Sequence, residues 1–408
     1  MTGSSITNSS AVAIQVPGPP AVPGPPGFLF TAFEPSGDDH AATVIAELRR
    51  RHPTVPVYAW GGPKMERAGA IIIEHTGQDA VMGIPGMGKI IEHLQVNKRV
   101  KEFVQRQPLL VHVPVDSPAA NTPLAAIAKR HGVKVVNLVA PQFWAWGPWR
   151  ADKLRQISDL VLCILPFEEP WFKERRIPAR YIGHMLFDHK LNPTQLDQQA
   201  DLFPQGSPKI ALMPGSRPKE IDRNWGILLQ AYRRIESQFP GMSGMVAATT
   251  PGVEAVLRSK AREFGGWPDS LGCVCGQTDA VVRWTDLALV VSGTVTLQIA
   301  KQNKPMIILY KTSKVMFKLI GSWLLKAEFF TLPNLIAGKR IVPEHVPYFG
   351  DGDDIADQAA ALLRDPSAME LQSRELARII TRFRGLNASS GAADAIEQVA
   401  GLTHARPA

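Results

Sequence analysis

Two short turns in the second half of the chain carry residue types that bind phosphate groups. The first, in the stretch IALMPGSRPKEI, follows an apolar run and contains Gly215, Ser216, Arg217 and Glu220. The second, Ser292-Gly293-Thr294, also follows an apolar run and precedes a predicted helix. Backbone N–H groups at a helix start bind anions, and a guanidinium group holds a diphosphate through paired hydrogen bonds. The pattern predicts one anionic ligand that meets both turns; a simple change of chain direction is the alternative.

Acidic side chains mark the corresponding positions of the first half. Asp116 follows the apolar stretch LLVHVPV, so its carboxylate could serve as a general base at the tip of a buried strand. The alternative for Asp116 is an Asx-turn or a helix cap. Glu34 and Asp38 flank the Ser36-Gly37 turn and are open to the same two interpretations. Ser36 with Asp39 three residues later predicts a capping box at the start of the following helix.

Three tryptophans lie close together in APQFWAWGPWRADKL: Trp144, Trp146 and Trp149. Tryptophan suits stacking against a ligand or covering an apolar one. The cluster predicts either a wall of a substrate site or a packed domain edge.

The elements that position these residues alternate between short apolar strands and helices. GFLFTAF, VPVYAW, LLVHVPV and VKVVNLVA are typical of buried strands in the first half, and KIALMP, SGMVAAT, LALVVSG and PMIILY in the second. Alternating strands and helices predict an α/β protein whose parallel sheets are covered on both faces. In such sheets ligands bind beyond the carboxyl ends of the strands. No G-x-G-x-x-G or Walker motif is present, which argues against NAD and ATP as ligands.

Composition limits the classes of partner. The formal net charge is +8, which favours an acidic ligand or surface, but the basic residues are scattered and no nucleic-acid-binding module is evident. The three cysteines provide neither a disulfide framework nor enough ligands for a zinc site, and a reducing cytoplasmic compartment follows. No apolar run is long enough to span a bilayer. Segments 81–104 and 314–326 mix bulky apolar residues with lysines, which predicts surfaces that lie on an anionic membrane or, alternatively, core helices.

The ordered set of motifs resembles the lipid-A-disaccharide synthase family. The resemblance extends from about residue 28 to residue 345. Glu34 with Ser36-Gly37-Asp38 resembles a Glu-x-Ser-Gly-Asp loop of the family. The other motifs that carry it, in order, are GGPKM, VMGIPG, PQFWAW with Arg150, LPFE, IGH, MPGSRPKEI, SGTVTL, LPNLIAG and VPE.

The resemblance implies a GT-B fold with two Rossmann-like domains. The implied divisions are a tail at 1–26, an acceptor domain at 27–190, a linker at 191–207, a UDP-sugar domain at 208–365, helices at 366–402 that cross back to the first domain, and a tail at 403–408. It also implies an inverting enzyme that joins UDP-2,3-diacylglucosamine to 2,3-diacylglucosamine 1-phosphate (lipid X) and releases UDP. The resemblance implies no metal or other cofactor. It implies a peripheral position on the inner membrane, and it leaves open whether the protein forms a homodimer.

Site residues carried over from the family fall into two groups. Asp116 would be the base and Arg217 would neutralise the leaving diphosphate; the donor would contact Gly215, Ser216, Arg217, Glu220, Ser292, Gly293, Thr294, Gln298, Asn334 and Glu344. The acceptor and lipid side would include Glu34, Ser36, Gly37, Asp38, Met82, Asn121, Trp144, Trp146 and Arg150.

The chain departs from the family pattern at several of these positions. Ala119 stands where the family has a second aspartate, and Gln298 stands where it has a glutamate. Gly147, Met185 and Phe33 replace an arginine, a proline and a glycine. Two alternatives therefore stay open: a paralogue that has lost activity or changed its target but still binds a UDP-sugar or lipid, and another UDP-sugar enzyme on the same scaffold.

Overall fold

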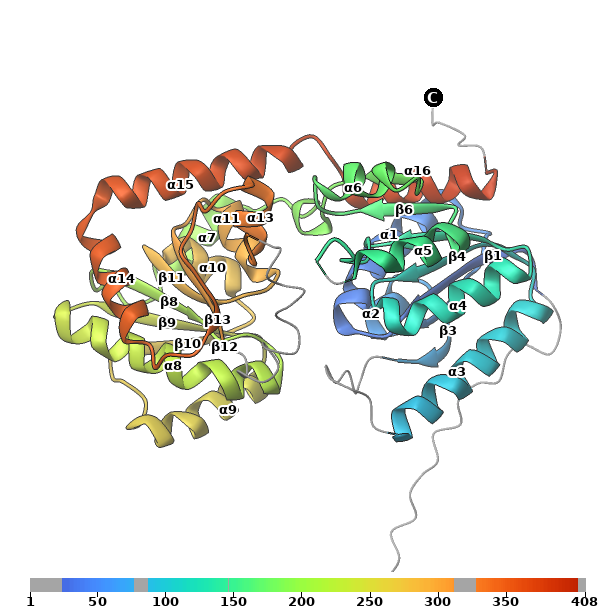
Figure 1. Cartoon of the computed structure of the whole chain (residues 1–408). Coiled ribbons are helices and arrows are strands. Elements are labelled where there is room, and N and C mark those ends of the chain that lie inside the picture. Colours follow the sequence, from blue (N-terminus) through green and yellow to red (C-terminus); the bar gives the residue numbers. More distant parts are fainter. Residues whose placement is uncertain (1–23, 77–86, 146, 312–327, 403–408) are drawn as a thin grey trace, which may run out of the picture.

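The computed structural model describes residues 24–76, 87–145, 147–311 and 328–402, and these form two α/β halves that stand side by side (Figure 1). The first half contains a parallel sheet of order β3-β2-β1-β4-β5-β6-β7. Its strands are β1 (Gly27–Ala32), β2 (Val57–Gly61), β3 (Ile71–His75), β4 (Leu109–Val115), β5 (Lys134–Leu138), β6 (Leu160–Cys163) and β7 (Ala179–Tyr181). Its helices are α1 (Pro35–Arg51), α2 (Pro63–Arg67), α3 (Met87–Arg106), α4 (Pro118–Arg130), α5 (Ala151–Ile157) and α6 (Glu168–Glu174), with 3-10 turns η1 (Pro148–Arg150) and η2 (Met185–Phe187).

The second half contains a parallel sheet of order β10-β9-β8-β11-β12-β13. Its strands are β8 (Lys209–Met213), β9 (Ser243–Ala248), β10 (Leu271–Cys275), β11 (Leu287–Val291), β12 (Met306–Lys311) and β13 (Glu344–Tyr348). Its helices are α7 (Pro193–Ala200), α8 (Pro218–Gln238), α9 (Pro251–Ala261), α10 (Thr278–Trp284), α11 (Val295–Lys301), α13 (Leu332–Ala337), α14 (Asp353–Arg364) and α15 (Pro366–Ile380), with η3 (Arg262–Phe264).

Burial explains why the strands read as continuous apolar runs. Every residue of β1 is buried, as is every residue of β9 and β11. Strands covered by helices on both faces need apolar side chains on both faces, so period-two alternation is lost. The predicted α/β class with two parallel sheets is confirmed.

In both sheets the strand order reverses near the centre, and this reversal determines where a ligand can bind. β1 lies between β2 and β4, and β8 lies between β9 and β11. The carboxyl ends of such strands form the ligand crevice of open α/β sheets. Glu34 and Asp116 follow β1 and β4, while Arg217 and Ser292 follow β8 and β11. The topology therefore gathers the predicted residues of each half at one sheet edge.

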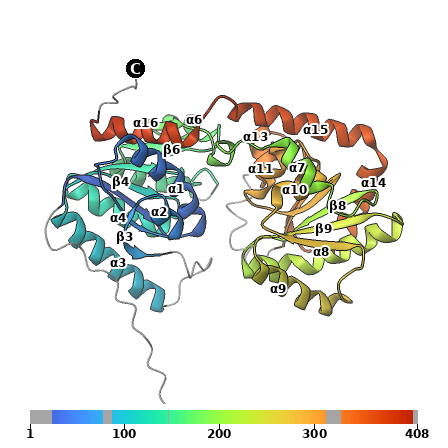
Figure 2. The ribbon, with the colours of Figure 1, turned by 180° about the vertical axis from the view of Figure 1, so that it is seen from behind.

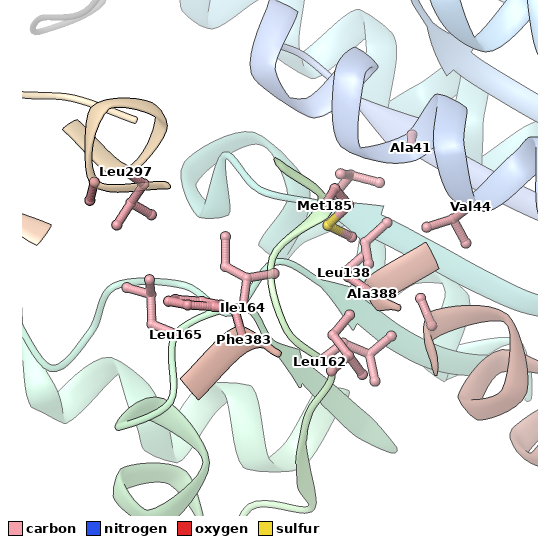
Figure 3. Packing of buried hydrophobic residues seen from close by; sticks show 14 of the residues in the cluster. Ala41, Val44, Leu138, Leu162, Ile164, Leu165, Met185, Leu297, Phe383 and Ala388 are labelled. Atoms are coloured by element: carbon pink, nitrogen blue, oxygen red, sulfur yellow. The ribbon is translucent and has the colours of Figure 1, made fainter. Parts of the chain in front are cut away.

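The C-terminal segment connects the two halves. Helix α15 packs on α11, α13 and α14 of the second half, and α16 (Ala388–Ala400) packs on α1, β4 and β5 of the first. Figure 2 shows the same arrangement from behind, with α15 and α16 on opposite halves. Between them lies η4 (Thr381–Phe383), whose Phe383 packs in the same apolar cluster as residues of the first half; Ile164 and Leu165 lie next to it in Figure 3.

Some local expectations differ from the structure. The capping box is wrong: α1 starts at Pro35 with Glu34 in the N-cap position and no side-chain cap, because proline takes the first helical position and leaves Ser36 inside the first turn. The predicted linker contains α7, which packs on α10. Met82, Trp146, segment 314–326 and most of both tails lie outside the described residues. Among the helices that are described, none is both long and apolar enough to cross a bilayer.

Candidate active site

The turn that carries Asp116 has a strained backbone. Asp116 and Ser117 have φ angles of 50° and 43°, in the left-handed region that residues other than glycine rarely adopt. Each such residue costs about 1–3 kcal/mol unless its surroundings hold it there. The side-chain amide of Asn121 does so, because its Nδ2 donates to the carbonyl oxygens of Val115 (2.9 Å) and Asp116 (2.8 Å). Asn121 is only 2% exposed, and its amide is bonded to the backbone of the turn.

A buried chain of hydrogen bonds fixes Asn121 in turn. The Thr31 hydroxyl donates to Asn121 Oδ1 at 2.7 Å, so the Nε2–H of His112, at 2.9 Å, must donate to that hydroxyl. Nδ1 of His112 is then an acceptor, and among the described residues it has no hydrogen-bond partner. Complete burial lowers the pKa of His112 to about 3, which keeps the imidazole neutral. The chain therefore positions Asp116 through three buried polar groups.

The structure brings residues of the two halves into contact at Glu34. Its Oε1 accepts a hydrogen bond from Ser117 Oγ at 2.9 Å, beside Asp116. Its Oε2 lies 3.4 Å from Nη2 of Arg217, which belongs to the second half. Glu34 and Arg217 remain 31% and 41% exposed, so both are open to a ligand. Among the described residues, no donor contacts the Asp116 carboxylate, which leaves its oxygens available to accept a proton.

Arg217 stands at the N-terminus of the long helix α8. It occupies the N-cap position, and its Nη1 lies 3.2 Å from Oε1 of Glu220 one turn along. Gly215 before it has φ 93°, and a Cβ there would come within 2.8 Å of Glu220, so glycine is required. The Arg217 guanidinium therefore stands at the positive end of the α8 dipole, and this combination suits an anion.

The Ser292–Thr294 loop lies at the neighbouring strand end. Gly293 and Thr294 are exposed where β11 meets α11. Gln298, one turn into α11, donates from Nε2 to Oδ1 of Asp279 at 2.9 Å, and both residues line a polar cavity of about 330 Å³. Asp279 thus supplies a carboxylate beside the position where the family pattern has one.

Sequence reasoning missed three titratable neighbours of this edge. His40 lies one turn along α1 from Ser36, and its ring meets that of His184 edge-on with centroids 5.5 Å apart. Burial lowers the pKa of His40, while the charge of Asp116 acts to raise it. Burial lowers the pKa of His184 to about 3. The i, i+4 spacing from Ser36 was the available signal for His40, and IGH contains His184.

Glu168 is the third missed residue, although it ends the LPFE motif. It is 1% exposed and accepts three hydrogen bonds, from the backbone N–H groups of Ile164 and Leu165 and from Nε1 of Trp144 at 3.2 Å. Burial raises its pKa to about 7, and the Asp116 charge adds to the increase. The hydrogen bond to Glu168 therefore fixes the indole ring of Trp144, which also packs edge-on against Phe167 with ring centroids 4.9 Å apart.

Other predicted site residues hold the protein's own backbone. Asp38 caps α2 by accepting from the N–H groups of Gly62, Lys64 and Met65. Gly37 is buried in α1, and Ser36 is half-buried beside it. The Asn334 amide bonds to Ile341 and Val342, and Glu344 accepts from Phe330 and Thr331. Arg150 is exposed at the end of η1. Within the described part of the chain, no cluster of three metal-ligating side chains occurs.

Comparison with known proteins identifies the family. The family model for lipid-A-disaccharide synthetase matches residues 28–396. The lipid-A-disaccharide synthase of Myxococcus xanthus is 31% identical over 376 residues, which cover 91% of this chain and 97% of that protein. That of Geobacter sulfurreducens is 29% identical over 386 residues, with 92% and 95% covered. The chain belongs to the lipid-A-disaccharide synthase family.

Membership in the family confirms the predicted function, a glycosyltransferase of lipid A biosynthesis, and gives no support to the alternative of a binding protein without activity.

Solved structures confirm the GT-B fold. A Staphylococcus aureus MnaA–UDP structure matches with a TM-score of 0.61 at 10% identity, covering 94% of this chain and 99% of that one. Acinetobacter baumannii MurG matches with a TM-score of 0.55 at 12% identity, covering 92% and 100%.

Proposed function

We propose that this synthase transfers the sugar of UDP-2,3-diacylglucosamine to the 6-hydroxyl of lipid X, with inversion. The observation that carries the proposal is the contact between the two halves, where Glu34 touches both Ser117, next to Asp116, and Arg217. The sheet edge of the first half then presents the Asp116 carboxylate, which no described donor contacts. The sheet edge of the second half presents the Arg217 guanidinium at the N-terminus of α8. A glycosyl acceptor and a nucleotide diphosphate need these two groups on opposite sides of the transferred carbon.

In the proposed step, the Asp116 carboxylate takes the proton of the acceptor hydroxyl as its oxygen attacks the anomeric carbon. The new carbon–oxygen bond forms while the bond from that carbon to the diphosphate breaks, and UDP leaves with the electron pair. Arg217, the α8 N-terminus and the Ser292–Thr294 loop stabilise the charge that develops on the diphosphate. A single displacement of this kind inverts the anomeric centre.

The proposal includes peripheral contact with the inner membrane surface, because both substrates carry acyl chains. Within the described part of α3, Leu94 is 62% exposed, and Lys98 and Lys101 follow it. An apolar side chain next to lysines on one helix suits an anionic lipid surface.

The test is product formation from radiolabelled donor and lipid X in detergent micelles. Asp116→Asn should lower kcat by about 10²–10⁴-fold, the usual contribution of a general base. Arg217→Ala should lower it by about 10²–10³-fold, as expected for the loss of a group that stabilises transition-state charge. Asp269→Asn and Arg262→Ala, both at exposed positions, are matched controls that should retain activity. Wild-type protein that binds UDP but forms no disaccharide would contradict the substrate assignment.

A further inference from the structure

An apolar hollow lies between α4 and α5, next to the turn that carries Asp116. Its lining includes Ala119 and Pro123 of α4, Phe143, Trp149 and Leu154, and its volume is about 420 Å³. Trp149 is 53% exposed, and Ala119 is exposed in the first turn of α4, three residues after Asp116. We call this the α4–α5 hollow. An exposed apolar depression of this kind marks a binding surface.

Two cations lie at the same hollow. Arg150 and Lys153 line it and are exposed, and among the described residues no carboxylate forms an ion pair with either side chain. Other exposed cations nearby are paired: Arg155 bonds Asp152, and Lys173 bonds Glu169. Unpaired charge beside apolar surface fits a ligand that combines a hydrocarbon chain with an anionic group.

We propose that the α4–α5 hollow binds one acyl chain of the sugar acceptor while Arg150 and Lys153 bind its phosphate. This inference rests on the proposed function. The donor's diphosphate has its own cation, Arg217, in the other half, so the anion that meets Arg150 and Lys153 beside Asp116 is the acceptor's. A volume near the lower end of the usual small-molecule range, about 300–1,000 Å³, suits one chain rather than two.

Ala119 explains part of the hollow's character. This position carries a carboxylate in the family pattern that the sequence resembles, whereas here it presents only a methyl group to the lining. An aspartate there would place a charge against the hydrocarbon and repel the phosphate. The departure from the pattern thus extends the apolar surface to within one turn of Asp116.

The test measures kcat/KM against acyl-chain length, with acceptors that differ by two methylenes. Within the length that the hollow holds, wild-type kcat/KM should rise by up to about fourfold per added methylene, the factor that corresponds to full burial of each group. Ala119→Trp, which fills the hollow from an exposed position, should flatten this dependence. Ala361→Trp, at an exposed alanine of α14, is the matched control and should keep the wild-type slope.

A second arm compares acceptors with and without the 1-phosphate in neutral detergent. Arg150→Ala/Lys153→Ala should reduce the preference for the phosphorylated acceptor by about tenfold, as expected for lost charge-assisted hydrogen bonds. An unchanged slope in Ala119→Trp would overturn the acyl-chain assignment. An effect of the double variant seen only with phosphatidylglycerol vesicles would assign the cations to the membrane surface and overturn the phosphate assignment. Absence of product with every acceptor would instead contradict the proposed function.

Discussion

At the residue scale, Glu168 shows how burial changes the chemistry of one carboxyl group. It is enclosed against Trp144, and burial raises its pKa to about 7 from an ordinary value of 4.5. The folded protein therefore binds a proton that the unfolded chain releases between those two values. Stability from this group is fully present below pH 4.5 and is lost as the pH rises through 7. The shift corresponds to a loss on the order of 3 kcal/mol.

We predict that Glu168→Gln flattens this part of the pH dependence of the unfolding free energy. Glutamine carries no charge at any pH, but it cannot accept all three N–H groups, so the variant should be less stable than wild type by about 1–3 kcal/mol at pH 5. The difference should shrink by pH 8. Urea unfolding at pH 5, 6.5 and 8 measures it, with Glu174→Gln on the exposed side of α6 as the control. A constant difference across that range would contradict the raised pKa.

At the element scale, the strands could be predicted from the sequence more accurately than the side chains that support the site. LLVHVPV coincides with β4, because a strand covered on both faces is apolar along most of its length, and the buried His112 is too short an interruption to change its limits. The residues that support the site were not predictable in the same way. Asn121 and Asn334 carry motif positions but bond to backbone groups five to eight residues away, and that depends on the path of the turn rather than on spacing. His40 and Glu168 become neighbours of Asp116 only when α1, α6 and β4 are packed together.

The docking of α16 gives a second prediction. Asp188, after η2, accepts from the N–H groups of Ala388 (2.7 Å) and Ser389 (2.8 Å), so a carboxylate from another segment caps this helix together with its own N-cap residue, Asn387. We expect Asp188→Ala to destabilise the protein by about 1–2 kcal/mol, since the hydrogen bonds of this carboxylate and its interaction with the helix dipole are lost while the Asn387 cap stays. Hydrogen exchange should increase first in α16. Asp269→Ala, at an exposed position, is the control, and unchanged exchange in α16 would show that the cap contributes little.

At the scale of the whole molecule, the two halves meet through a few polar contacts in addition to the C-terminal segment. Nζ of Lys301, on α11, donates to the carbonyl oxygens of Leu186 (2.8 Å) and His189 (2.6 Å) near the crossing between the halves. At the sheet edges, the half-exposed pair Glu34–Arg217 links the turn after β1 to the start of α8. The same guanidinium is the group proposed to hold the diphosphate. Under that proposal, Glu34 competes with the diphosphate for Arg217.

This competition predicts that Glu34→Gln tightens UDP binding. Loss of a half-exposed ion pair and of a carboxylate near the diphosphate should lower Kd by about two- to fivefold, in line with the modest strength of such pairs. Screening should reduce the gain at 0.5 M salt, because the effect is electrostatic. Calorimetric titration with UDP at low and high salt measures both. Glu220→Gln is the matched variant, since it removes the partner of Arg217 that lies within the same half. If Glu34→Gln alone weakens UDP binding, Glu34 holds Arg217 in place for the ligand rather than competing with it, and the contact between the halves is part of the bound state.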